Sequence, residues 1–311
     1  MVRDYRRMDS FGSRLARDLV KNYGLYLLLV PAILFYTLFC YKPLYGAIIA
    51  FKRYVPTKGI VASPWVGLTH FEAFFGSYYF WRLLRNTLTI SLATLVFGFP
   101  APIILALLLN EVRSTRFKRF VQTITYMPHF ISMVVMCGLI RLFTQDTGVV
   151  VQALSLFGFE PVSLLSRAEY FVPVYVLSGV WQGIGWGSII YLSALTGIDP
   201  ELYEAATIDG ANRWRKTLHV TLPGIAPTII IMLLLRMGSV MNVGYEKIIL
   251  LYNEGIYETA DVISTFVYRK GLEQAQWSYS AAVGLFNSVV NFIIIVLMNR
   301  FSRAITDVSL W

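Results

Sequence analysis

Charged residues are scarcer in this sequence than in ordinary soluble proteins. Asp, Glu, Lys and Arg together make up 14% of the 311 residues, whereas hydrophobic residues make up 56%. A soluble domain carries about 25% charged residues. Several uncharged runs here reach the ~20 residues that a helix needs to cross a bilayer. The composition therefore argues against a soluble globular protein and predicts an all-α, polytopic membrane protein.

Carboxylates are missing from the long apolar runs altogether. The gaps in charge predict six transmembrane helices, and none of them contains Asp or Glu. A secondary transporter would need intramembrane carboxylates for ion coupling, so this class is the less favoured alternative. The six predicted spans are 22–41, 86–110, 120–140, 170–195, 222–243 and 278–300.

Residues that could support catalysis or hold a metal are also few. The sequence has no Gly-x-x-x-x-Gly-Lys-Ser/Thr loop, so the chain itself does not hydrolyse ATP in the P-loop manner. We expect no catalytic residue, no metal site and no cofactor on this chain. One histidine, His129, follows Pro128 inside the third predicted span and is expected to be a core residue at a helix kink. Metal-ligand spacing is absent among the histidines and cysteines, which are His70, His129, His219, Cys40 and Cys137.

Lys and Arg give the predicted orientation. The net charge of +9 lies mostly at the N-terminus and between apolar runs, which fits orientation in a membrane rather than nucleic-acid binding. With the N-terminus inside, the cytoplasmic pieces carry 15 Lys and Arg in 63 residues, against 11 in 105 on the opposite side. We therefore predict cytoplasmic termini, with a cytoplasmic segment 1–21, a six-helix domain over 22–303 and a tail over 304–311.

A short polar island, residues 199–223, separates the fourth and fifth predicted spans. Asp199 is placed to cap a helix, with Pro200 at its first position. Gly210 suits the left-handed conformation that commonly ends a helix. A second amphipathic segment follows, and Thr221-Leu222-Pro223 returns the chain to the bilayer. The pattern predicts a compact helix–turn–helix that docks against a partner.

These residues resemble the signature cytoplasmic loop of the permease subunits of binding-protein-dependent ABC importers. The resemblance implies that the segment from Glu204 to Gly210 is a coupling helix, which sits in a cleft of an ATP-hydrolysing subunit. Motion of that subunit would then switch the transmembrane helices between inward-facing and outward-facing states. The residues to which the resemblance assigns this coupling are Glu204, Ala205, Ala206, Asp209, Gly210, Leu222 and Pro223.

The resemblance also implies partners and a location. The chain is expected to lie in a bacterial cell (inner) membrane, surrounded by lipid, and to pair with a second permease that is a different chain. Two cytoplasmic ATPase subunits, which hold ATP and magnesium, would bind beneath, and an extracytoplasmic solute-binding protein would deliver substrate above. Within the family, the chain is similar to the oligosaccharide and polysaccharide uptake group, related to the maltose transporter. The segments that carry this likeness are 126–132, 211–214 and 257–268.

Arg236 is an ionisable residue within the fifth predicted span, and such residues are functional candidates by default. It could line the substrate path, snorkel toward an interface or pair with Glu246. If the span is one helix, Arg236, Ser239 and Val243 can share one face. An arginine in the path would suit an acidic oligosaccharide of the uronate type, as in alginate or pectin, and a neutral sugar is the alternative.

The fourth predicted span carries Trp181–Ser188, with two tryptophans, a glutamine and three glycines. Tryptophans and a glutamine suit stacking and hydrogen bonding to a sugar, whereas glycines equally suit close helix packing. The resemblance to the maltose permease, together with the spacing around Arg236, places the substrate path at Gln182, Gly183, Trp186, Arg236, Ser239, Asn242 and Val243.

Overall fold

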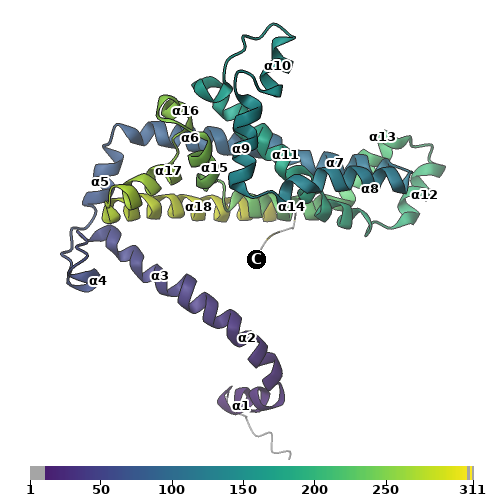
Figure 1. Ribbon diagram of the computed structural model, residues 1–311. Coiled ribbons are helices and arrows are strands. Elements are labelled where there is room, and N and C mark those ends of the chain that lie inside the picture. Colours follow the sequence, from purple (N-terminus) through teal and green to yellow (C-terminus); the bar gives the residue numbers. More distant parts are fainter. Residues whose placement is uncertain (1–10, 307–308, 310–311) are drawn as a thin grey trace, which may run out of the picture. The chain divides into compact units, whose positions relative to one another are not determined.

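The computed structural model describes residues 11–306 and residue 309, and each regular element among them is helical (Figure 1). The one β-type contact in this part of the chain is an isolated bridge between Lys52 and Trp65. The chain divides into two units, Met1–Gly67 and Leu68–Trp311. Parts of the predicted terminal segments 1–21 and 304–311 lie outside the described residues.

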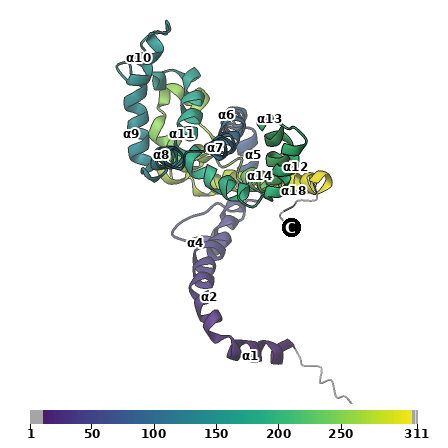
Figure 2. The ribbon, with the colours of Figure 1, turned by 90° about the vertical axis from the view of Figure 1, so that its right-hand side faces the viewer.

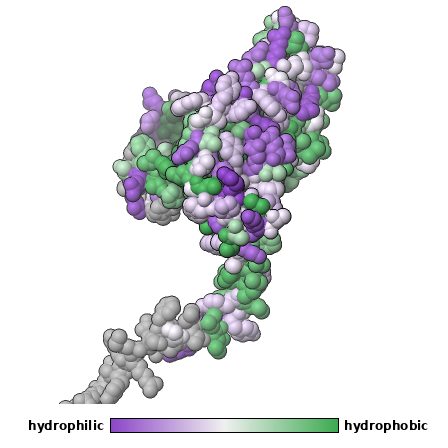
Figure 3. All heavy atoms as spheres, turned by 90° about the vertical axis from the view of Figure 1, so that its left-hand side faces the viewer, coloured by the Kyte–Doolittle hydropathy of each residue, from purple (hydrophilic) through white to green (hydrophobic). Residues whose placement is uncertain are grey.

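The first unit is built around one long apolar helical run, Tyr23–Phe51. Its 29 residues are enough to cross a bilayer, and none in its most apolar stretch is buried inside the chain. Apolar side chains accordingly lie on the surface of this run (Figure 3). The run extends ten residues beyond the predicted span 22–41. The helices of this unit are α1 (Phe11–Lys21), α2 (Tyr23–Phe35), α3 (Lys42–Leu44) and α4 (Gly59–Ala62).

A π-helical turn precedes a proline at three places in the described part of the chain. Proline has no amide hydrogen, so the carbonyl four residues before it loses its usual α-helical partner. A π turn shifts the hydrogen bonds by one residue and lets the helical run continue through this site. The three pairs are Tyr36–Tyr41 before Pro43, Thr94–Gly98 before Pro100, and Thr217–Thr221 before Pro223.

The second unit contains the remaining helices. It begins with α5 (Thr69–Phe75), α6 (Tyr79–Ala93), α7 (Pro100–Glu111), α8 (Thr115–Tyr126), α9 (Met133–Thr144), α10 (Val149–Ser155) and α11 (Ala168–Leu195). It continues with α12 (Pro200–Ile208), α13 (Arg213–Lys216), α14 (Leu222–Met237), α15 (Tyr245–Leu251), α16 (Tyr257–Ala260), α17 (Ile263–Tyr268) and α18 (Trp277–Thr306).

Five helical runs among the described residues are long and apolar enough to cross a membrane. They are Tyr23–Phe51, Tyr79–Glu111, Met133–Ser155, Arg213–Met237 and Trp277–Ala304. The fourth predicted span, 170–195, corresponds to α11, which has 28 residues but is not one of these five. Its glycines, tyrosines and serines make α11 less apolar than the other runs.

The predicted third span, 120–140, is wrong as one continuous helix. α8 ends at Tyr126, a 3₁₀ turn holds Pro128, and Ile131 takes an extended backbone conformation. Ser132 then starts α9 as its N-cap, because its Oγ accepts the amide of Val135 at 3.4 Å. The apolar run in this region therefore begins at Met133 rather than at residue 120.

α11 packs against α7, α8 and α14 in the centre of the second unit (Figures 1 and 2). Its glycines make this packing close. A Cβ atom on Gly185 would lie 2.1 Å from the backbone oxygen of Thr125 on α8, and one on Gly187 would lie 2.9 Å from Cγ of Pro102 on α7. Two of the three glycines of Trp181–Ser188 thus serve close helix packing.

Candidate functional site

A cavity of about 550 Å³ lies in the second unit, within the ~300–1,000 Å³ range of small-molecule sites. Its walls come from α6 and α7 with the turn between them, from the start of α9, from α11, and from the chain that runs from α14 to α15. Six of the seven residues predicted for the substrate path line it. These are Gln182, Gly183, Arg236, Ser239, Asn242 and Val243.

Trp186, the seventh predicted residue, is not in the cavity lining. Its indole ring lies parallel to the imidazole of His129, with ring centroids 4.6 Å apart. Both side chains are exposed on the second unit. The expectation that His129 is a core histidine is therefore wrong, because the chain breaks around Pro128 and carries His129 outward.

The helix that carries Arg236 ends one residue later, which corrects the expected shared face of Arg236, Ser239 and Val243. α14 ends at Met237 and α15 begins only at Tyr245. Gly238 lies at this break, where an added Cβ would come 2.6 Å from Cδ1 of Ile295. These residues reach one cavity because an unwound segment, residues 238–244, curves along its wall.

Two asparagines of α18 and a serine of α6 hold the unwound segment in place. Asn291 Oδ1 accepts the Met241 amide at 3.0 Å, and Asn291 Nδ2 donates to Asn242 Oδ1 at 3.2 Å. Asn287 Nδ2 donates to the same oxygen at 2.9 Å, and Ser91 Oγ donates to the backbone oxygen of Val240. Backbone groups outside regular helices need such hydrogen-bond partners when they are shielded from water. The signal in the sequence was the pair of asparagines four residues apart in an apolar run.

Lys247 is the residue of this cavity that sequence reasoning missed. It belongs to α15, its side chain is buried, and it lines the cavity. Its Nζ donates to the backbone oxygen of Tyr175 at 2.9 Å and lies 4.6 Å from the centroid of the Tyr175 ring. A lysine next to a run of Ile and Leu is a sequence signal for a buried charge. The predicted spans, however, placed this stretch in an external loop.

The cavity is cationic. Arg236 and Lys247 line it, and no carboxylate appears among the described residues that do so. No ion pair joins Arg236 to Glu246, both of which the structure describes, so that alternative reading of Arg236 fails. A cavity with two positive charges and no acid attracts anionic groups.

The polar island 199–223 forms the predicted helix–turn–helix. Asp199 Oδ1 accepts the Glu201 amide at 3.0 Å and caps α12. Gly210 has a φ of +73°, as expected at a helix end. Asn212 Oδ1 accepts the Arg215 amide at 2.9 Å and caps α13. Both helices lie together at one end of the second unit (Figure 1).

The outer surface of this island is exposed and partly apolar. Glu204, Ala205, Asp209 and Gly210 are exposed, and Ala206 is half-buried. Apolar side chains accompany them, since Ile208 is 88% and Trp214 is 69% exposed. Leu222 and Pro223 open α14 at the base of the island. Tyr203 and Thr221 fasten α12 to that base through a 3.1 Å hydrogen bond between their hydroxyl groups.

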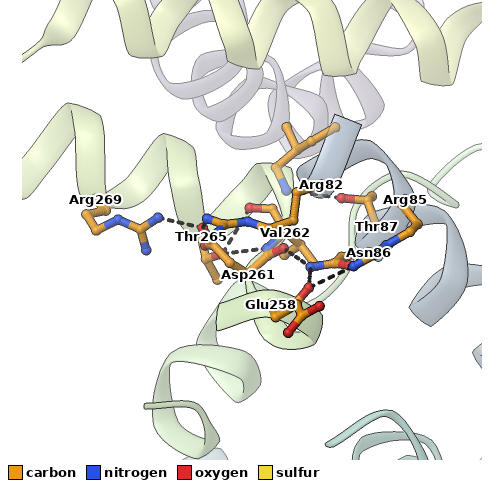
Figure 4. Close-up of polar contacts among 10 residues, drawn as sticks. Arg82, Arg85, Asn86, Thr87, Glu258, Asp261, Val262, Thr265 and Arg269 are labelled. Atoms are coloured by element: carbon orange, nitrogen blue, oxygen red, sulfur yellow. Dashed lines mark hydrogen bonds and ion pairs between the residues drawn. The ribbon is translucent and has the colours of Figure 1, made fainter. Parts of the chain in front are cut away.

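A second polar cluster surrounds the fully buried carboxylate of Asp261 (Figure 4). Asp261 connects α16 to α17, two helices that lie away from α12 in the second unit (Figure 1). Arg269 Nη2 lies 2.6 Å and Arg82 Nη2 3.5 Å from Asp261 Oδ2. Thr265 Oγ1 donates to Asp261 Oδ1 at 2.8 Å, and Asn86 Nδ2 donates to the Asp261 backbone oxygen at 3.0 Å. These bonds join α6 to the segment around α16 and α17.

A family model described as the binding-protein-dependent transport system inner membrane component matches residues 98–307, which is more than half of the chain. The chain belongs to this family. The resemblance found in residues 204–210 and 222–223 is therefore confirmed, and the permease is a multi-pass membrane component that leaves ATP hydrolysis to partner subunits.

Relatives and solved structures agree with this assignment. The permease is 44% identical over 291 residues to the polygalacturonan/rhamnogalacturonan transport system permease protein YteP of Bacillus subtilis, covering 93% of this chain and 91% of that protein. It is 46% identical over 286 residues to protein LplB of the same organism, covering 92% and 90%. A crystal structure of a bacterial ABC transporter involved in import of the acidic polysaccharide alginate matches at 46% identity and a TM-score of 0.86, covering 94% of this chain and 99% of that chain.

Proposed function

We propose that this permease forms half of the path by which an ATP-driven importer takes up acidic oligosaccharides. The observation that carries the proposal is the cavity lined by Arg236 and Lys247 with no carboxylate among its described lining residues. Names of similar proteins support it, because polygalacturonan is a uronate polymer and alginate is described as an acidic polysaccharide. Gln182, Ser239 and Asn242 would supply hydrogen bonds to sugar hydroxyls.

The proposed topology has six transmembrane helices with both termini in the cytoplasm. Five runs have the length and hydropathy for this, and α11 would be the sixth. The excess of Lys and Arg on the side of the N-terminus supports the orientation. Single cysteines at Ser114 and Thr147, in a chain without Cys40 and Cys137, should label only from the cytoplasmic and external sides, respectively. Labelling of both from one side would contradict this topology.

Coupling to ATP hydrolysis is assigned to the exposed island, through Glu204, Ala205, Ala206, Asp209 and Gly210. The exposure of Glu204, Ala205, Asp209 and Gly210, together with that of Ile208 and Trp214, supports a docked partner, because exposed apolar side chains gain from being covered. The partner proposed here is one of two cytoplasmic ATPase subunits, which hold ATP and magnesium. Leu222 and Pro223 would pass the motion to α14.

The remaining proposed partners are a second, different permease chain and an extracytoplasmic solute-binding protein. One solved relative supports the latter, since it is described as an alginate ABC transporter in complex with an alginate pentasaccharide-bound periplasmic protein. That structure matches at 44% identity and a TM-score of 0.87, covering 96% of this chain and 100% of that chain.

ATPase activity of the reconstituted complex with its binding protein tests the proposal. We expect stimulation by tetragalacturonate or by an alginate oligomer and little by a neutral galacto-oligosaccharide of equal length. Stimulation by the neutral sugar alone would reject an acidic substrate while keeping the importer. Failure of any ATPase subunit to co-purify with the permease would reject the coupling role of the island.

A further inference from the structure

Lys247 makes a contact that the fold does not require. The Tyr175 carbonyl lies inside the continuous helix α11, where a backbone amide one turn later is its normal partner. Ser178 Oγ also donates to this oxygen, at 3.1 Å. The ammonium group of Lys247 is therefore an additional donor, and a smaller apolar residue at this position would leave no carbonyl without a partner.

Lys247 lines the cavity next to residues of α11. Gly179 lies one helical turn beyond Tyr175 and also lines the cavity. A Cβ atom on Gly179 would come 3.4 Å from Lys247 Nζ, so the glycine leaves the space directly beside the ammonium group free of a side chain. An ammonium group has three donors, and Tyr175 O takes one of them.

No carboxylate lies among the described residues that line the cavity with Lys247. The buried carboxylate of Asp261 pairs with Arg82 and Arg269, and Glu160 and Glu169 pair with Arg167, so none of these three acids pairs with Lys247. A buried cation without a carboxylate is costly to the fold. The ring of Tyr175 offsets part of this cost through its π face. The rest of the cost is expected to be recovered when an anion binds.

Arg236 and Lys247 approach the cavity from different elements. Arg236 comes from the end of α14 and Lys247 from α15. The unwound segment between them is fixed by Asn287 and Asn291 of α18. The segment that links the two positive charges is therefore fixed in place. A ligand with one carboxylate could neutralise only one of these charges.

We propose that Lys247 is a specificity-determining residue that binds a second carboxylate of the substrate, so that Arg236 and Lys247 together select oligomers carrying at least two uronate units. The inference rests on the proposed function. It narrows the proposed acidic substrates to those that carry at least two carboxylates. A chain of uronates carries one carboxylate on each sugar unit and can meet both cations at once.

The test uses the complete transporter in proteoliposomes, with its partner permease, ATPase subunits and binding protein, and measures tetragalacturonate uptake. We expect Lys247→Gln to raise KM by about tenfold, the effect of losing one charged hydrogen bond. Lys247→Arg should restore KM to within about threefold, because it keeps the charge. Lys270→Gln is the matched control, since Lys270 Nζ bonds Gln274 Oε1 and lies over the Phe266 ring, outside the cavity.

A structural role for Lys247 gives a different pattern. It predicts reduced thermal stability and a lower maximal rate for Lys247→Gln, with KM unchanged, and that result would overturn the inference. So would an unchanged KM in Lys247→Gln combined with a raised KM in Arg236→Gln, which leaves the proposed function intact. If wild type takes up neutral oligosaccharides and not tetragalacturonate, the proposed function itself fails. Should Lys247→Gln not assemble, wild type and Lys247→Arg compared at pH 9 provide the same test.

Discussion

Arg269 Nη2 lies 2.6 Å from Oδ2 of Asp261, a carboxylate that is completely shielded from solvent (Figure 4). Burial by itself would lower the pKa of Arg269, but the hydrogen bond and the charge of Asp261 raise it above its ordinary value. Arg82 is the second cation at this carboxylate, at 3.5 Å. The cluster thus joins α6 to the start of α17 through charge, around a carboxylate that has no contact with bulk water.

Removing Arg269 should destabilise the permease strongly. Arg269→Met leaves the buried Asp261 with the longer contact to Arg82, and breaking a buried pair costs about 3–5 kcal/mol. Thermal unfolding of the purified complex would show this as a lower midpoint. Arg167→Met is the control, because its pairs with Glu160 and Glu169 are exposed and worth at most about 1 kcal/mol. Equal losses in both variants would contradict the assigned role.

Gly185→Ala should disrupt the packing of α8 on α11. The new Cβ would sit 2.1 Å from the Thr125 oxygen, so the helices must separate, at a cost of about 1–3 kcal/mol or more. Gly183→Ala provides the comparison, because nothing lies within 4 Å of its Cβ position and alanine favours the helix by up to ~1 kcal/mol. Unfolding midpoints of the two variants should therefore move in opposite directions. A stable Gly185→Ala complex would refute the close contact.

Substitutions at Gly210 should reduce substrate-stimulated ATP hydrolysis to an extent that depends on the new side chain. Its φ of +73° is costly for a β-branched residue but accessible to asparagine. We expect Gly210→Val to lose most of the substrate-stimulated ATPase activity and Gly210→Asn to keep much of it. Glu204→Lys, which reverses an exposed charge, should also abolish stimulation. If Gly210→Val were stimulated as strongly as wild type, the loop geometry would not govern coupling.

Uptake of the acidic substrate should depend on pH through Lys247. Burial lowers the pKa of Lys247 to about 8, and the neighbouring Cys137 opposes this shift. Tyr175 is the other titratable group that faces it, and Arg236 lies in the same cavity. Because the ammonium form is lost as pH rises through 8, KM for tetragalacturonate should rise up to about tenfold between pH 7 and pH 9. Lys247→Arg should flatten this profile; a profile identical to that of wild type would exclude Lys247 as the titrating group.

The polar island was predictable because its signals are local. Asp199, Gly210 and Asn212 act on their own turns through caps and one positive φ, so the helix–turn–helix followed from the residues themselves. The long apolar runs were predictable for the same reason, since length and lack of charge decide them. The role of the island in coupling remains a prediction.

The breaks inside apolar segments were not predicted, because hydropathy does not register them. Pro128 and Ser132 carried a stop and a start signal within the third predicted span, but the apolar pattern outweighed them. The unwinding after Met237 depends on tertiary bonds from Asn287 and Asn291, which lie about 50 residues away in the chain. Lys247 was missed because its place at the cavity depends on this unwinding.

The contact of Gly185 with Thr125 also limits how the permease can move. The backbones of α8 and α11 pack closely at Gly185, so we expect the two helices to move together as one body. Four residues, 196–199, separate the end of α11 from α12. Because this linker is short, a displacement of α12 would be passed to α11, whose residues line the cavity. Movement caused by ATP hydrolysis in the proposed partner subunits would then reach the substrate cavity through α12 and the joined pair of α11 and α8.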